Sequence, residues 1–166
     1  MRSGIVVWFT GLPASGKTTL ATSVQERLPD SILLDSDVVR EALGADGYGR
    51  ADRDDFYRIL AKLAKLIQDQ GQVVLVAATA PRRAHRDAAR ALIPHFVEVH
   101  VRTPIATCEA RDVKGLYARA RAGDAPALPG IGGAYEPPLA PDVVAEHGRD
   151  QAAIAAIERL VSSRSP

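Results

Sequence analysis

The sequence predicts an α/β protein with three layers, in which helices cover both faces of a central, mainly parallel sheet of five strands. Two observations predict this fold class. Short apolar runs rich in β-branched residues alternate along the chain with segments whose apolar residues recur at helical spacing. The apolar runs are nearly continuous, as in strands that are buried on both faces. Such alternation favours parallel strands joined by crossover helices.

Length and composition fit one compact domain over residues 1–166. Hydrophobic residues make up 46% of the chain and charged residues 25%, and the formal net charge is +1. A balance this close to neutral gives no support to a nucleic-acid or membrane partner, so we expect neither. The apolar run near the N-terminus is too short for a membrane span or a signal peptide. The single cysteine, Cys108, cannot form an internal disulfide, so we expect a reducing, cytoplasmic environment.

Five apolar runs predict the strands of the sheet. Four of them consist of five or six residues with little polar interruption, which is typical of strands in the middle of a parallel sheet. The fifth is shorter and predicts a last, short strand. In chain order the predicted strands cover residues 5–10, 31–35, 73–78, 96–101 and 142–145.

Helical spacing and helix-ending residues predict the segments between the strands. Pro29 ends the first helix, Ser36 or Asp37 can cap the second, and Gly71 ends the third. In chain order the predicted helices cover residues 16–28, a segment that runs to Leu43, 52–70, 84–93, a segment opened by Thr103-Pro104, and 150–161. The helix over 52–70 is amphipathic, and the residues expected along its apolar face are Phe56, Ile59, Leu60, Leu63 and Ile67.

Two irregular segments interrupt this alternation. Residues 44–50 form a glycine-rich loop. Residues 112–141 crowd glycines and prolines into a stretch without apolar periodicity. A stretch of this length inside a compact domain is usually functional, and we expect a lid over the site.

The first strand leads directly into a phosphate-binding motif. GLPASGKT fits the pattern G-x-x-x-x-G-K-[ST], and it lies between a predicted strand and a predicted helix, as the motif requires. Its backbone N–H groups and the helix N-terminus bind phosphate oxygens, while Lys17 reaches the β and γ phosphates and the Thr18 hydroxyl binds Mg²⁺. Because no N-K-x-D guanine motif is present, ATP is the expected nucleotide. The expected ATP-binding residues here are Gly11, Leu12, Pro13, Ala14, Ser15, Gly16, Lys17, Thr18 and Thr19.

Charged residues after the second strand predict an acceptor side. Asp35 and Asp37 follow this strand, at the sheet edge where ligands bind in parallel α/β proteins. One carboxylate can take the proton of an acceptor hydroxyl and the other can hold Mg²⁺, although Asp37 can also be a simple helix cap. Arg40 and Arg53 follow, and either bind phosphate or sulfate oxygens or are solvated helix residues.

Six blocks of sequence make the chain similar to the adenylylsulfate (APS) kinase family of P-loop kinases. In order they are GLPASGKTT, LLDSDVVREAL, ADRDD, HRDAARAL, VEVHVRTPIATCEARDVKGLYARARAG and PGIGGAYEPP. The block around CEARD and KGLY is far more specific than the phosphate-binding motif. The resemblance implies a three-layer P-loop fold, the use of Mg²⁺ and a homodimer. It also implies transfer of the ATP γ-phosphoryl group to the 3′-hydroxyl of adenylyl sulfate, forming PAPS in sulfate assimilation.

The resemblance also implies roles by position. The acidic pair supplies the base and a metal contact, with Thr18 and Asp35 as the metal-binding residues, and Arg111 lies against the adenine of ATP. The implied catalytic residues are Lys17, Asp35, Asp37 and Lys114. The implied acceptor-binding residues are Asp37, Arg40, Tyr48, Arg53, Phe56, Lys114 and Leu128.

The chain departs from the family pattern on the acceptor side. Phe56 stands where the family usually has asparagine, and its helical spacing also allows a purely core role. Leu128 replaces a phenylalanine of the adenine slot, Gly132 replaces an acidic residue, and Tyr48 retains an aromatic face. A second interpretation is therefore a kinase with a changed acceptor, such as another nucleotide conjugate or a small metabolite. A binding protein without turnover is disfavoured because the expected lysines and aspartates are all present.

Overall fold

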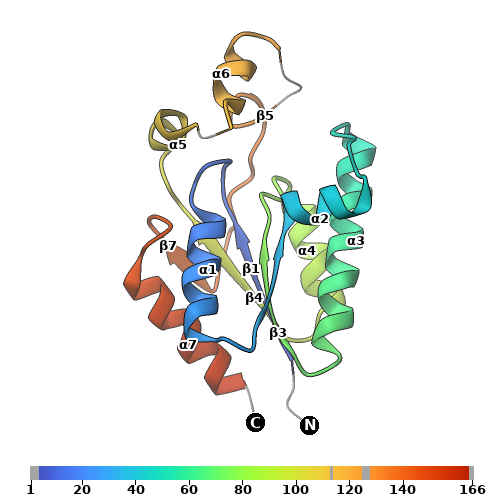
Figure 1. Ribbon diagram of the computed structural model, residues 1–166, viewed down its shortest axis with the longest axis vertical. Helices are drawn as coiled ribbons and strands as arrows, with labels where there is room; N and C mark the ends of the chain where they lie inside the picture. Colours follow the sequence, from blue (N-terminus) through green and yellow to red (C-terminus); the bar gives the residue numbers. More distant parts are fainter. Residues whose placement is uncertain (1–3, 113, 125–127, 165–166) are drawn as a thin grey trace.

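Five parallel strands form the centre of the protein. The computed structural model describes residues 4–112, 114–124 and 128–164 (Figure 1). The strand order is β2-β3-β1-β4-β7, and every neighbouring pair is parallel. The strands are β1 (Ile5–Thr10), β2 (Ile32–Asp35), β3 (Val73–Ala77), β4 (Phe96–Val101) and β7 (Val143–Ala145). The predicted three-layer α/β/α fold with a parallel five-stranded sheet is thus confirmed.

Helices cover both faces of this sheet. The helices of the described residues are α1 (Lys17–Arg27), α2 (Ser36–Leu43), α3 (Arg50–Gln68), α4 (Arg83–Leu92), α5 (Ile105–Arg111), α6 (Leu116–Arg121) and α7 (Gln151–Arg164), and four of them, α1, α3, α4 and α7, cover the sheet faces. Side chains alternate along β1, so Val7 and Phe9 pack in one core with α1 and α7, while Val6 and Trp8 pack in a second core with α3 and α4. Figure 1 shows these two helix pairs on opposite sides of the sheet.

The buried face of α3 differs from the predicted one. Ile59 is 40% exposed, so its expected place on the apolar face is wrong. The buried stripe consists of Phe56, Tyr57, Leu60, Ala61 and Ala64, together with Gln68. This stripe keeps the spacing of three and four residues, and its two alanines allow a close approach to the sheet. Branched residues at its margins therefore lie partly in solvent.

The structure also corrects the expected cap of α2. The Asp35 carboxylate accepts hydrogen bonds from the backbone N–H groups of Asp37 (2.9 Å) and Val38 (3.4 Å). Asp35, rather than Ser36 or Asp37, is therefore the N-cap residue, because a cap must precede the first turn to reach its unpaired N–H groups.

The predicted lid contains regular structure. Helix α6 and the short strands β5 (Leu128–Pro129) and β6 (Gly132–Gly133) lie within residues 112–141, while residues 113 and 125–127 fall outside the described part. Figure 1 shows α5, α6 and β5 above the carboxyl ends of the strands. In the described ranges, no helix is both long enough and apolar enough to cross a membrane.

A buried arginine holds the last part of the lid segment, which follows β6, against the sheet. The guanidinium of Arg86 in α4 is 1% exposed and donates to the Glu98 carboxylate of β4 (3.2 Å). It also donates to the backbone carbonyls of Ala80 (2.5 Å) and Glu136 (2.5 Å). Burial raises the pKa of the Glu98 carboxyl, and the positive charge of Arg86 opposes this shift. Arg86 thereby connects β4, the loop after β3 and the segment that follows β6.

We expect Arg86→Met to lower the free energy of unfolding by about 3 kcal/mol, because it leaves the buried Glu98 carboxylate without its main counter-charge. Urea denaturation measures the loss. Arg58→Met is the matched control, since Arg58 pairs with Asp55 at an exposed site and its removal should change stability by less than about 0.5 kcal/mol. Equal losses in the two variants would contradict the assigned role of Arg86.

Candidate active site

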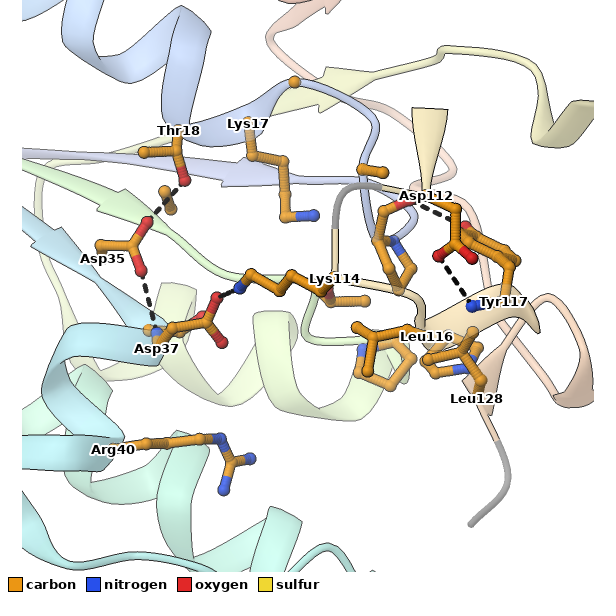
Figure 2. Close-up of a pocket in the computed structure, with 18 of the residues that line it drawn as sticks. Lys17, Thr18, Asp35, Asp37, Arg40, Asp112, Lys114, Leu116, Tyr117 and Leu128 are labelled. Atoms are coloured by element: carbon orange, nitrogen blue, oxygen red, sulfur yellow. Dashed lines mark hydrogen bonds and ion pairs between the residues drawn. The ribbon is translucent and has the colours of Figure 1, made fainter. Parts of the chain in front are cut away.

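A cavity of about 620 Å³ lies beside the phosphate-binding loop, α2 and the lid (Figure 2). Its size is within the usual range for small-molecule sites. Most of the residues predicted for the site line this one cavity: Pro13, Ala14, Gly16, Lys17, Thr18, Thr19, Asp35, Asp37, Arg40, Tyr48, Arg53, Arg111, Lys114 and Leu128. Gly11, Leu12, Ser15 and Phe56 are not among its lining residues. The individual roles of all these residues remain predictions.

The phosphate-binding loop depends on a close contact with a distant segment. Gly16 has a φ of +98°, and a Cβ there would lie 2.8 Å from the Cα of Gly148. A Cβ on Gly148 would in turn lie 2.8 Å from the carbonyl oxygen of Gly16. The loop is further held by Thr103, whose hydroxyl donates to the Ser15 carbonyl (2.6 Å). The backbone curvature that presents N–H groups to phosphate therefore requires glycine at both contacting positions.

Lys17 is held inside the curve of this loop. Its ammonium donates to the carbonyl oxygens of Gly11 (3.1 Å) and Leu12 (2.8 Å). Burial lowers the pKa of Lys17 to about 8, even though the nearby carboxylates of Asp37 and Asp35 act to raise it. The ammonium is thus placed where an anionic ligand would stabilise its charged form.

Asp35 joins the loop to α2. One oxygen of its carboxylate caps α2, as described above, and the other accepts a hydrogen bond from the Thr18 hydroxyl (2.5 Å). A hydroxyl and a carboxylate oxygen side by side fit Mg²⁺, which prefers oxygen ligands and keeps several waters or phosphate oxygens. Within the described residues, no group of three or more His, Cys, Asp or Glu side chains could hold a metal by itself. The pair therefore suits a metal that is shared with phosphates.

Asp37 and Lys114 form an ion pair across the cavity, between α2 and the lid (Figure 2). Their side chains are 60% and 59% exposed, so the pair adds little stability. It does bring together an acidic residue of the acceptor side and a basic residue of the lid, which are 77 positions apart along the chain.

Two lid residues were missed by the sequence reasoning. The Asp112 carboxylate accepts from the backbone N–H groups of Tyr117 and Ala118, both at 2.9 Å, and so caps α6. The Tyr117 hydroxyl donates to the carbonyl of Pro13 (2.8 Å), which attaches the lid to the phosphate-binding loop. The N-cap residue of α6 is Gly115, so the preference of aspartate for the N-cap position does not identify Asp112. Tyr117 carries no signal in the sequence either.

The acceptor side is built on α2 and α3. Arg40 lines the cavity although it is only 8% exposed, and Tyr48 and Arg53 lie in the same wall. Phe56 is 2% exposed and belongs to the core, which favours the core alternative over direct contact with an acceptor. The next residue, Tyr57, lines the cavity instead and was also missed. Tyr57 belongs to the same buried stripe as Phe56 and is 7% exposed, so it packs in the core and also lines the cavity.

Comparison with known proteins gives consistent matches. The family model described as adenylylsulphate kinase matches residues 3–146. The adenylyl-sulfate kinase of Shewanella denitrificans is 45% identical over 155 residues, which cover 89% of this chain and 76% of that protein. The adenylyl-sulfate kinase of Paraburkholderia xenovorans is 46% identical over 152 residues, covering 88% of this chain and 85% of that protein.

A solved structure matches over almost the whole length. The APS kinase of Mycobacterium tuberculosis, in complex with AMPPNP and APS, has a TM-score of 0.89 and 39% sequence identity. The alignment covers 98% of this chain and 99% of that chain.

We expect the affinity for a non-hydrolysable ATP analogue to fall as pH rises through about 8. Phosphate binds the charged ammonium form of Lys17. Above the pKa of Lys17 the side chain is mostly a neutral amine, and binding must then include uptake of a proton, which weakens the observed affinity. Binding without Mg²⁺, measured by calorimetry, should be about tenfold weaker at pH 9 than at pH 7. In Lys17→Arg the guanidinium stays charged, so this dependence should disappear. An equally steep dependence in this variant would contradict the assignment to Lys17.

Proposed function

The chain belongs to the adenylylsulphate kinase family, and on this basis we propose that it transfers the γ-phosphoryl group of ATP to the 3′-hydroxyl of adenylyl sulfate, forming PAPS. The observation that supports this most is the meeting of three parts in one cavity: the loop with Lys17, the acidic pair Asp35 and Asp37, and Lys114 of the lid. Phosphoryl transfer depends mainly on positioning and charge stabilisation, and these parts supply both.

The phosphate-binding loop holds the donor in this proposal. Its N–H groups and the N-terminus of α1 bind the phosphates, and Lys17 contacts the β and γ oxygens. The Thr18 hydroxyl and the Asp35 carboxylate hold Mg²⁺, which supplies charge neutralisation on the phosphate oxygens when it is bound. Arg111 lies on α5 near the same loop, where it contacts the adenine of ATP.

Asp37 and Lys114 act at the point of transfer. Asp37 accepts the proton of the attacking hydroxyl, and Lys114 leaves its ion pair to contact the transferring phosphoryl group as negative charge develops. The acceptor is bound by Arg40, Arg53 and the aromatic Tyr48. Leu128, which lines the same cavity from the lid, contacts the acceptor from the lid side. The lid, attached through Tyr117, excludes water from the reaction.

We further propose, from the family resemblance, that two copies of the chain form a homodimer. Sedimentation at the mass of a single chain would contradict this.

Adenylyl sulfate should stimulate release of ADP from MgATP by the purified protein, with formation of PAPS detected by chromatography. A matched acceptor that lacks the 3′-hydroxyl should give no stimulation, because the nucleophile is absent. A panel of other hydroxyl acceptors tests the alternative of a changed acceptor. Stimulation by one of these, with none by adenylyl sulfate at saturation, would replace the proposed reaction.

We expect Asp37→Asn to lower kcat by about 10²- to 10⁴-fold, because the general base is lost. Its dependence on free Mg²⁺ should stay close to that of the unchanged protein. Asp35→Asn should instead raise the Mg²⁺ concentration needed for half-maximal rate, while its amide oxygen still caps α2. Kinetics across a Mg²⁺ titration measure both effects. The opposite pattern in the two variants would exchange the roles of the two carboxylates.

A further inference from the structure

Two aromatic rings lie against the guanidinium of Arg40. Its central carbon is 3.8 Å from the centre of the Phe56 ring and 4.7 Å from the centre of the Tyr48 ring. Both distances are well within the range of cation–π attraction. Phe56 is buried and Tyr48 is about half exposed, so the first of these contacts is shielded from water.

Backbone carbonyls fix one end of the same guanidinium. Its Nη1 donates to the carbonyl of Gly47 (3.2 Å) and more distantly to that of Ala45 (3.4 Å). A guanidinium donates in its plane and has apolar faces, so a ring against a face leaves the in-plane donors available for oxygens. The carbonyls and the two rings therefore restrict the position of the Arg40 guanidinium in the cavity wall, and the Tyr57 side chain forms a further hydrogen bond with it.

We propose that Phe56 is a positioning residue for the acceptor: its ring holds the Arg40 guanidinium in the orientation that binds the anionic part of adenylyl sulfate. This inference rests on the proposed function for the identity of the acceptor. Phe56 itself does not contact the substrate, and it acts through Arg40. The residue thus has a role in binding even though it belongs to the core.

A purely structural role for Phe56 makes a different prediction. Its ring also packs edge-on against that of Tyr57, and Phe56 belongs to the same core cluster as Val39 and Leu60. If core packing were its only role, a smaller apolar residue would lower stability without changing affinity for one substrate in particular. Kinetics with separate substrates can therefore distinguish the two roles.

The kinetic experiment compares three single variants of α3, a double variant and the Arg40→Gln parent of that double variant. Phe56→Leu should raise the KM for adenylyl sulfate by about tenfold, with the KM for ATP changed less than about twofold. Phe56→Tyr keeps the ring and should restore the KM for adenylyl sulfate. Leu60→Val, a matched change one turn along α3, should lower the melting temperature without raising this KM. In an Arg40→Gln background, Phe56→Leu should cause no further increase, because the residue through which it acts is gone.

A second measurement does not depend on any substrate. The Phe56 ring should shift the NMR signal of the Arg40 Nε–H proton upfield, and Phe56→Leu should remove this shift while melting curves show that the variant is folded. An unchanged signal in this variant, or an unchanged KM for adenylyl sulfate, would overturn the inference. Loss of the ring shift in a protein that adenylyl sulfate does not stimulate would instead overturn the proposed function and leave the Phe56–Arg40 contact established.

Discussion

The register of three parallel strands is the constraint on which the site depends. Asp35, the last residue of β2, pairs with Ala77 of β3, and Ala77 pairs with Phe9 of β1. Asp35 is therefore level with the end of the strand that leads into the phosphate-binding loop. A shift of one residue in either pairing would move the carboxylate away from the Thr18 hydroxyl and turn it to the other face of the sheet. The pairing of β2 and β1 with β3 thus determines where the donor and acceptor sides meet.

The sequence predicts best the parts whose environment is uniform. The strands Ile5–Thr10 and Phe96–Val101 have the predicted bounds, because continuous apolar runs arise where both faces of a strand are buried. The phosphate-binding loop is predicted equally well, because the local conformation of its backbone requires glycine at fixed positions. Ile59 was misplaced because spacing shows that a helix has an apolar face but not how wide the buried stripe is.

Contacts between distant segments could not be predicted from local patterns in the sequence. The ion pair of Asp37 and Lys114 and the hydrogen bond from Tyr117 to Pro13 join α2 and the lid to partners far along the chain. Nothing in the local pattern distinguishes Tyr57 from other helix residues, because its place in the cavity wall follows from how α3 packs on the sheet. A local pattern shows which residue type a position favours. The positions of Lys114, Tyr117 and Tyr57 in the site depend instead on how the whole chain folds.

The contact between Gly16 and Gly148 extends the requirements of the phosphate-binding motif beyond its own eight positions. Each residue occupies the space that a side chain on the other would need. During sequence divergence neither position is free to acquire even a methyl group on its own, although Gly148 lies in the connection between β7 and α7. At this one position, the tolerance of the connection to mutation is therefore set by the geometry of the phosphate-binding loop.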